Sequence, residues 1–125
     1  MNVASLELCK ELYELSSWDG THFIHAEQKV LSGGTHWMVV PYDAHIYPKL
    51  RSHVAAYDLG YLIRKLQNTK LRKTALKLNR SKGDAGVWVA RTYKGGRELS
   101  AVAGTPEDAV AKLLILVIAK GWITP

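Results

Sequence analysis

This sequence contains little cysteine and no long apolar run, and it has few acidic residues between residues 64 and 97. Only one of its 125 residues is a cysteine, Cys9, so an internal disulfide is excluded and a reducing compartment, the cytoplasm, is expected. The longest unbroken apolar run, residues 113–119, is far short of the roughly 20 residues that a membrane-spanning helix needs. Lys10 and Glu11 interrupt the apolar stretch that a signal peptide requires. We therefore expect a cytoplasmic protein with no membrane partner.

Motifs for metals and cofactors are also lacking. The sequence has no HExxH and no pair of CxxC motifs, which excludes the usual structural zinc sites. His22 and His25 are three residues apart, so on a strand they lie on opposite faces and cannot share one metal ion. Neither GxGxxG nor a Walker loop occurs. The sequence predicts no metal site and no cofactor.

Motifs for catalysis are missing in the same way. There is no GxSxG nucleophile elbow. A two-histidine phosphoesterase would carry Ser or Thr two residues after each histidine, whereas the residue two positions after His22 is Ile24. We expect a protein without enzymatic activity and assign no catalytic residue. The alternative is a phosphodiesterase in which His45 or His36 acts with Asp43.

Length and patterning predict one α+β domain, residues 1–125. Helical spacing of apolar residues predicts helices over 3–16, 51–66 and 106–120. Runs of β-prone residues predict strands over 21–31, 35–40, 87–93 and 98–103, with a short one over 77–79. The order is α-β-β-α-(β)-β-β-α. Strands joined by tight turns favour an antiparallel sheet with helices packed against it, an α/β/α-type sandwich.

The C-terminal part of the chain carries the clearest local signals. Gly95 and Gly96 can take the positive φ that a tight hairpin turn requires, and β-prone runs flank them. Thr105 is a helix N-cap, Pro106 suits the first helical position, and Gly121 suits the end of the helix. The helix between is apolar almost all round, so we expect it to form the core.

The excess positive charge is confined to one third of the chain. The net charge is +6, but residues 64–97 carry eleven Lys or Arg against one acid, a net of +10. Such an asymmetry indicates an anionic partner, although a lysine-rich solvated loop is the alternative.

A phosphate-binding site is predicted within this basic segment. Arginine donates two parallel hydrogen bonds to a phosphate, and an aromatic ring beside it can stack on a base. The residues predicted to bind a ligand are Arg64, Lys65, Arg72, Lys73, Arg91, Tyr93, Lys94, Arg97 and, as a stacking platform, Trp37.

The least regular stretch, residues 41–52, would suit a loop at the mouth of a pocket. It holds two prolines and two tyrosines, and His53 follows it. A connector with ordinary aromatic packing is the alternative.

Two stretches, AYDLGYLIRKL at residues 56–66 and AGTPEDAVAKLLI at residues 103–115, resemble small accessory proteins of tailed phages grouped as phage ABA sandwich domains. The resemblance covers the C-terminal half. It implies a phage or prophage origin, a compact α/β/α sandwich and a counter-defence role in the host cytoplasm. Some phage proteins of this size sequester the nucleotide messengers of bacterial immunity, usually as homo-oligomers with basic pockets.

The resulting hypothesis is a binding protein that sequesters a small phosphorylated ligand, a cyclic or ADP-ribose-type nucleotide, without catalysis. Gly60 and Tyr61 are candidates for a self-association surface in a homo-oligomer. The alternative is a basic inhibitor of a host defence protein, or a nucleic-acid-binding accessory protein of the anti-CRISPR kind.

Overall fold

The computed structural model describes residues 2–29, 31–42, 52–67, 77–80 and 87–125. Within them the chain forms three helices and six strands. In order these are α1 (Leu6–Ser16), β1 (Phe23–Lys29), β2 (Thr35–Pro41), β3 (Ser52–Ala56), α2 (Leu59–Gln67), β4 (Lys77–Arg80), β5 (Trp88–Lys94), β6 (Arg97–Ala103) and α3 (Pro106–Ala119). The α+β class is confirmed, and the order differs from the expected one by a strand between β2 and α2.

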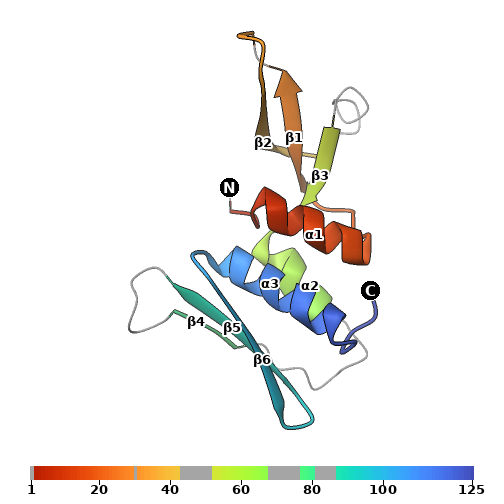
Figure 1. Cartoon of the computed structure of the whole chain (residues 1–125), viewed down its shortest axis with the longest axis vertical. Helices are drawn as coiled ribbons and strands as arrows, with labels where there is room; N and C mark the ends of the chain where they lie inside the picture. The colour runs from red at the N-terminus through yellow and green to blue at the C-terminus, as the bar shows by residue number, and fades with distance from the viewer. Residues whose placement is uncertain (1, 30, 43–51, 68–76, 81–86) are drawn as a thin grey trace.

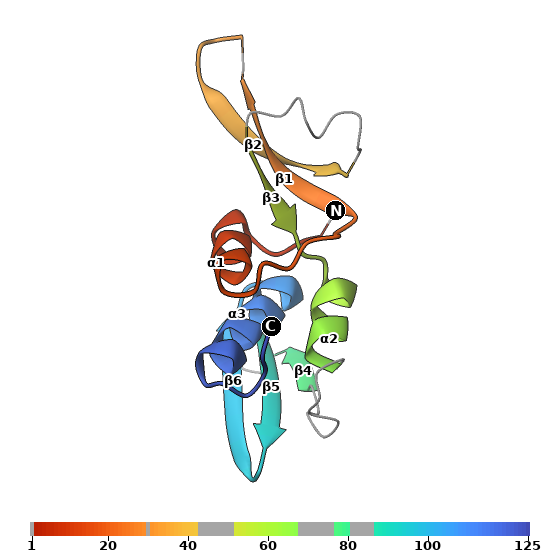
Figure 2. The ribbon, with the colours of Figure 1, turned by 90° about the vertical axis from the view of Figure 1, so that its right-hand side faces the viewer.

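The strands form two separate antiparallel sheets, of order β2-β1-β3 and β4-β5-β6. The sheets lie at opposite ends of the molecule, and the helices lie between them (Figures 1 and 2). α3 packs on β5 and β6, α1 and α2 pack on α3, and α1 also contacts β3. The expected antiparallel pairing is confirmed, but the strands do not join into one sheet.

α3 is the centre of the core, as its composition predicts. Val110, Leu113, Leu114 and Val117 on this helix are buried. The Thr105 hydroxyl accepts a 3.2 Å hydrogen bond from the Asp108 amide, and Pro106 occupies the first turn, so the predicted cap is confirmed. Gly121, with φ of 71°, ends the helix.

A second contact at the start of α3 ties it to the start of α1. The Asp108 carboxylate accepts a 2.7 Å hydrogen bond from the backbone amide of Ser5, the N-cap of α1. Just before it, the Ala4 amide donates a 2.9 Å hydrogen bond to the Tyr57 backbone oxygen, and Val3 forms a β-bridge with Asp58. The N-terminal residues therefore hold α1 between α3 and the strand β3.

The prediction of one helix over residues 51–66 is wrong in its first half. Ser52–Ala56 is the strand β3, which pairs with β1 from Phe23 to Glu27, and the helix is Leu59–Gln67. The Asp58 carboxylate accepts a 2.8 Å hydrogen bond from the Tyr61 amide and so caps α2 at that point. Hydrogen bonding to a strand far away in sequence outweighs the local preference of the alanines for helix.

The predicted hairpin forms as expected. Lys94 pairs with Arg97 across Gly95 and Gly96, whose φ angles are 56° and 78°. Ala90 and Thr92 of β5 are fully buried, so the residues that alternate with them lie on the face turned away from α3.

Cys9 lies on the buried side of α1 and has the role of a small core side chain. It is fully buried, and burial raises the pKa of its thiol to about 11.

Candidate functional site

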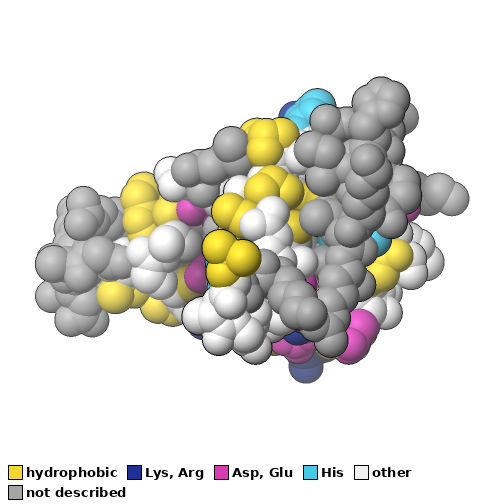
Figure 3. All heavy atoms as spheres, turned by 90° about the horizontal axis from the view of Figure 1, so that it is seen from above, with side chains coloured by type: hydrophobic (Ala, Val, Ile, Leu, Met, Phe, Trp, Pro, Cys, Tyr) yellow, Lys and Arg dark blue, Asp and Glu magenta, His cyan; other side chains and the backbone are white. Residues whose placement is uncertain are grey.

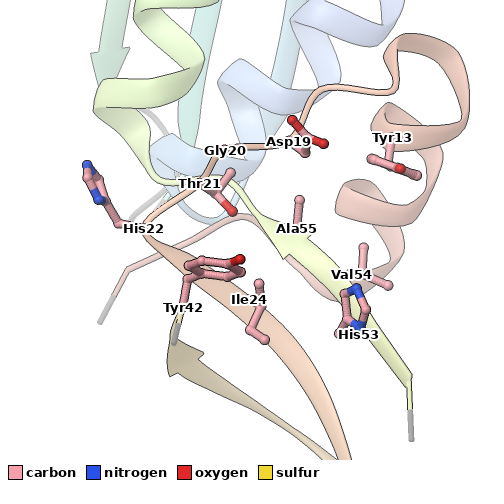
Figure 4. Close-up of a pocket in the computed structure, with 10 residues that line it drawn as sticks. All are labelled: Tyr13, Asp19, Gly20, Thr21, His22, Ile24, Tyr42, His53, Val54 and Ala55. Carbon is pink, nitrogen blue, oxygen red and sulfur yellow. The ribbon is translucent and has the colours of Figure 1, made fainter. Parts of the chain in front are cut away.

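A pocket of about 660 Å³ opens between α1, the first sheet and the loop that joins them (Figure 4). The lining residues come from α1, the loop, β1, β3 and the end of β2. They are Tyr13, Asp19, Gly20, Thr21, His22, Ile24, Tyr42, His53, Val54 and Ala55. This volume lies within the range of small-molecule binding sites.

The loop bordering the pocket begins where α1 ends. Ser17 takes a left-handed conformation, with φ of 56°, and its amide donates a 2.7 Å hydrogen bond to the Tyr13 backbone oxygen. The Ser16 hydroxyl donates to the Leu12 oxygen at 2.6 Å and accepts from the Trp18 amide at 3.2 Å. These short-range contacts turn the chain sharply toward the first sheet.

Two tyrosines, Tyr57 just before α2 and Tyr61 on α2, hold the same loop from its other side. The Tyr57 hydroxyl donates a 2.6 Å hydrogen bond to the Trp18 backbone oxygen, and the Tyr61 hydroxyl donates a 2.7 Å hydrogen bond to the Asp19 backbone oxygen. The two rings stack on each other, with centroids 5.3 Å apart. Burial raises the pKa of both phenols, which keeps the hydroxyls protonated as donors.

The pocket combines an apolar floor with aromatic and polar walls. Ile24 is only 3% exposed and lies on the sheet beside its cross-strand partner Ala55, whereas Tyr13 and Tyr42 are 42% and 49% exposed. Val54, the next residue along β3, points to the other face of the strand. Exposed aromatic rings beside an apolar floor can stack on a flat heterocycle.

The polar groups of the pocket are spread around its edge. Figure 4 shows Asp19 across the pocket from Ile24 and His53, and His22 on the far side of Tyr42 with its ring turned away from the others. Among the described lining residues none is Lys or Arg. Seen from the end where the first sheet lies, the described surface shows hydrophobic side chains with few basic ones (Figure 3).

His25 belongs to the framework rather than to the pocket. It is 6% exposed, and its Nε2 lies 3.0 Å from the Ala4 backbone oxygen, so Nε2–H donates to that carbonyl. Burial lowers the pKa of His25, although the Ala4 hydrogen bond and the charge of Glu7 act in the opposite direction. The ring thus ties β1 to the N-terminal segment in its neutral form.

Part of the predicted basic site lies together on the second sheet. Arg91 and Tyr93 share the face of β5 turned away from α3. Arg91 Nε lies 3.5 Å from Glu98 Oε1 on β6, and the Tyr93 hydroxyl donates to the same oxygen at 3.4 Å. The carboxylate of Glu98 partly offsets the positive charge that the sequence led us to expect there. Lys94 and Arg97 are exposed at the adjoining turn.

The other members of the predicted site lie elsewhere. Arg64 is exposed on α2, and the Lys65 ammonium lies 5.1 Å from the ring centroid of Trp18 and 5.5 Å from that of Tyr61. Trp37 is on β2 in the first sheet, where the Lys10 ammonium lies 4.9 Å from its ring centroid. The structure therefore does not bring Trp37 near Arg91, because the two sheets lie at opposite ends of the molecule (Figure 1).

Several further predictions fall on residues that are not described. Arg72 and Lys73 of the predicted ligand site, and His45 and Asp43 of the alternative catalytic pair, lie outside the described residues. His36 is exposed on β2.

The sequence carried partial signals for the pocket. Tyr42 lies in the irregular segment, residues 41–52, that would suit a pocket mouth, and His53 follows it. The Asp19-Gly20 pair is by itself a turn signal and does not indicate a ligand. Tyr13 gave no signal, because it fits the apolar spacing of an amphipathic helix.

Comparison of the chain with models of protein families, with curated proteins and with solved structures finds no match. In the described part of the chain, no helix has the length and apolarity to cross a membrane. The same residues contain no group of three or more His, Cys, Asp or Glu side chains placed to hold a metal ion.

Proposed function

We propose that the protein is a non-catalytic binding protein that holds a small nucleotide-type ligand in the pocket between α1, β1 and β3. The observation that carries this proposal is a cavity of about 660 Å³ lined by two half-exposed aromatic rings, Tyr13 and Tyr42, and by apolar side chains of the first sheet. Base-on-aromatic stacking is worth about 1–3 kcal/mol for each base. A pocket of this size accepts one nucleotide unit.

The position of the phosphate group follows from the charges of the lining. Asp19 repels a phosphate, and the described lining has no basic side chain inside the pocket. His22 and His53 are the lining residues able to donate hydrogen bonds to an anion from a ring nitrogen. His22 and His53 lie on opposite sides of the pocket (Figure 4), so we place the base inside the pocket and the phosphate at its open edge, away from Asp19.

The biological role in this proposal is counter-defence by sequestration of a nucleotide immune messenger. Its support is the resemblance of residues 56–66 and 103–115 to phage accessory proteins. Sequestration requires affinity but no turnover, so it requires no catalytic constellation.

A thermal-shift screen of the whole chain against mononucleotides, cyclic dinucleotides and cyclic ADP-ribose isomers tests the binding proposal. A ligand at 100 times its dissociation constant adds about 2.7 kcal/mol of stability. We expect Tyr42→Ala to weaken binding of the ligand found and Tyr93→Ala, on the second sheet, to leave it unchanged. The opposite result would move the site to the basic face of β5. No shift with any nucleotide would overturn the proposal.

Recovery of the ligand separates binding from catalysis. Bound nucleotide is released by denaturation and identified by chromatography after prolonged incubation. We expect the intact compound. A hydrolysed product would favour the phosphodiesterase alternative.

A second candidate function is binding of nucleic acid or inhibition of a nucleic-acid-binding host protein. The observation that favours it is the net charge of +10 over residues 64–97, together with the outward position of Arg91 and the exposed turn at Lys94 and Arg97. Binding to DNA or RNA would weaken steeply with salt through counterion release, and Lys94→Ala with Arg97→Ala would lower the salt slope. An affinity that hardly changes with salt would exclude this candidate.

A further inference from the structure

We propose that Asp19 selects the base, and that the pocket prefers guanine because guanine presents two adjacent N–H donors to a single carboxylate. This inference rests on the proposed nucleotide-binding function. Asp19 is the only charged side chain among the described lining residues.

Asp19 is held in place through its backbone. Its backbone oxygen accepts the 2.7 Å hydrogen bond from Tyr61, and the preceding Trp18 oxygen accepts the 2.6 Å hydrogen bond from Tyr57. Gly20, with φ of 74°, completes the turn that follows. A loop fixed through its backbone on two consecutive carbonyl groups presents its side chain from a defined position.

The Asp19 carboxylate is available to a ligand. Within the described residues, its oxygens take part in no hydrogen bond or ion pair. Asp19 is exposed, and Figure 4 shows its carboxyl group at the edge of the pocket, on the side opposite Ile24. By contrast, the carboxylate of Asp58 is used as the cap of α2.

An ionised carboxylate recognises groups that donate hydrogen bonds. Its two oxygens only accept hydrogen bonds, and they bind best to two parallel donors. Guanine offers such a pair, the ring N1–H and the exocyclic N2 amine, on one edge. Adenine and cytosine each offer one amine beside a ring acceptor, and uracil offers one N–H between two carbonyl oxygens. Those acceptors would face the carboxylate with like partial charge.

The aromatic and apolar part of the pocket lining does not distinguish one base from another. Tyr13 and Tyr42 can stack on any base, and Ile24, Val54 and Ala55 offer no hydrogen-bonding side chain. Among the described lining residues, Asp19 is the one whose side chain only accepts hydrogen bonds, so a preference for two adjacent N–H donors falls to it. A bidentate contact of this kind discriminates between bases by about 1–3 kcal/mol, which is about a fivefold to 150-fold difference in affinity.

The experiment compares GMP, IMP and AMP by isothermal titration calorimetry. IMP keeps the N1–H of guanine and lacks only its N2 amine, so it isolates the second hydrogen bond. We expect GMP to bind about tenfold or more tightly than IMP, and AMP to bind most weakly. In Asp19→Asn, one acceptor becomes a donor, and we expect the affinity for GMP to fall to that for IMP. Glu11→Gln also replaces a carboxylate by an amide, on the exposed face of α1, and should leave all three affinities unchanged.

The outcomes separate the two proposals. Equal binding of GMP and AMP, or an unchanged GMP preference in Asp19→Asn, would overturn the role of Asp19 while the nucleotide pocket stands. Absence of binding by every nucleotide, in a wild-type chain with a cooperative thermal transition, would overturn the proposed function and this inference together. An unchanged melting temperature in Asp19→Asn without ligand shows that a loss of binding is not a loss of fold.

Discussion

The hydroxyl group of Tyr61 donates a hydrogen bond of 2.7 Å to the backbone oxygen of Asp19, 42 residues earlier in the chain. Through this contact α2, which packs on the central helix α3, fixes the loop that borders the pocket. Tyr57 makes the parallel contact to Trp18. The position of the pocket wall is therefore set by a helix that contributes none of the described lining residues.

Removal of the Tyr61 hydroxyl should loosen this wall. In Tyr61→Phe the ring keeps its stacking on Tyr57, and the lost hydrogen bond costs about 0.5–1.5 kcal/mol of stability. We expect faster hydrogen exchange at the amides of Gly20 and Thr21 and weaker ligand binding. Tyr93→Phe, which removes a tyrosine hydroxyl from the second sheet, serves as the control. Exchange rates equal to those of the wild type would show that the hydroxyl does not hold the loop.

We expect the Asp108 side chain, which links α3 to α1, to contribute more to the stability of the protein than the Thr105 cap does. Thr105→Ala removes the cap of α3 and should cost about 1 kcal/mol. Asp108→Ala removes a charged acceptor 2.7 Å from the Ser5 amide and should cost about 1.5–3 kcal/mol. Asp108→Asn keeps an acceptor and should fall between the wild type and Asp108→Ala. Urea unfolding checks this ranking, and equal losses in Thr105→Ala and Asp108→Ala would contradict it.

The two glycines of the hairpin turn, Gly95 and Gly96, have a positive φ, whereas Gly104 does not. Gly96, with φ of 78°, should lose about 1–2 kcal/mol when changed to alanine, although no atom lies within 4 Å of the added Cβ. Gly95→Asn should be tolerated, since asparagine accepts a positive φ. Gly104 has the same open surroundings without a positive φ, so Gly104→Ala is the matched control. Similar losses at Gly96 and Gly104 would argue against a conformational cause.

A buried hydroxyl on β5 offers a stabilising substitution. Thr92 is fully buried, and its Oγ1 has no hydrogen-bond partner in the described part of the chain. Thr92→Val has nearly the same shape and removes the cost of burying an unpaired hydroxyl, about 1–3 kcal/mol. We expect a higher melting temperature. A lower melting temperature would indicate a partner for this hydroxyl in the folded chain.

His25 should make stability fall in mild acid. Its pKa is lowered in the folded protein, so the unfolded chain, with a pKa near 6.5, binds a proton more readily. Stability is then complete above pH 6.5 and decreases as the pH falls from there toward the folded-state pKa. In His25→Gln, urea unfolding at pH 7.5 and 5.5 should show a smaller difference than in the wild type. The exposed His36→Gln should keep the wild-type difference, and an unchanged difference in both variants would rule out His25 as its source.

The sequence determined the features that depend on residues next to one another. The cap at Thr105, the proline at Pro106 and the glycine turn at Gly95 and Gly96 act within a few residues, so their local chemistry is enough to predict α3 and the β5–β6 hairpin. The apolar character of α3 likewise predicts its place in the core. The α+β class follows from the alternation of such segments.

The tertiary structure decided which strands pair and which residues meet in the pocket. Ala55 and Ala56 suit a helix locally, yet pairing with β1 makes them part of a strand, because backbone hydrogen bonds to a distant segment exceed a small helix propensity. Asp19 and Tyr42 line the same pocket because β2 pairs with β1, which places the Tyr42 amide 2.8 Å from the His22 backbone oxygen, close in sequence to Asp19. Periodicity records which face of an element is buried, but not which element covers it, and that choice places the pocket.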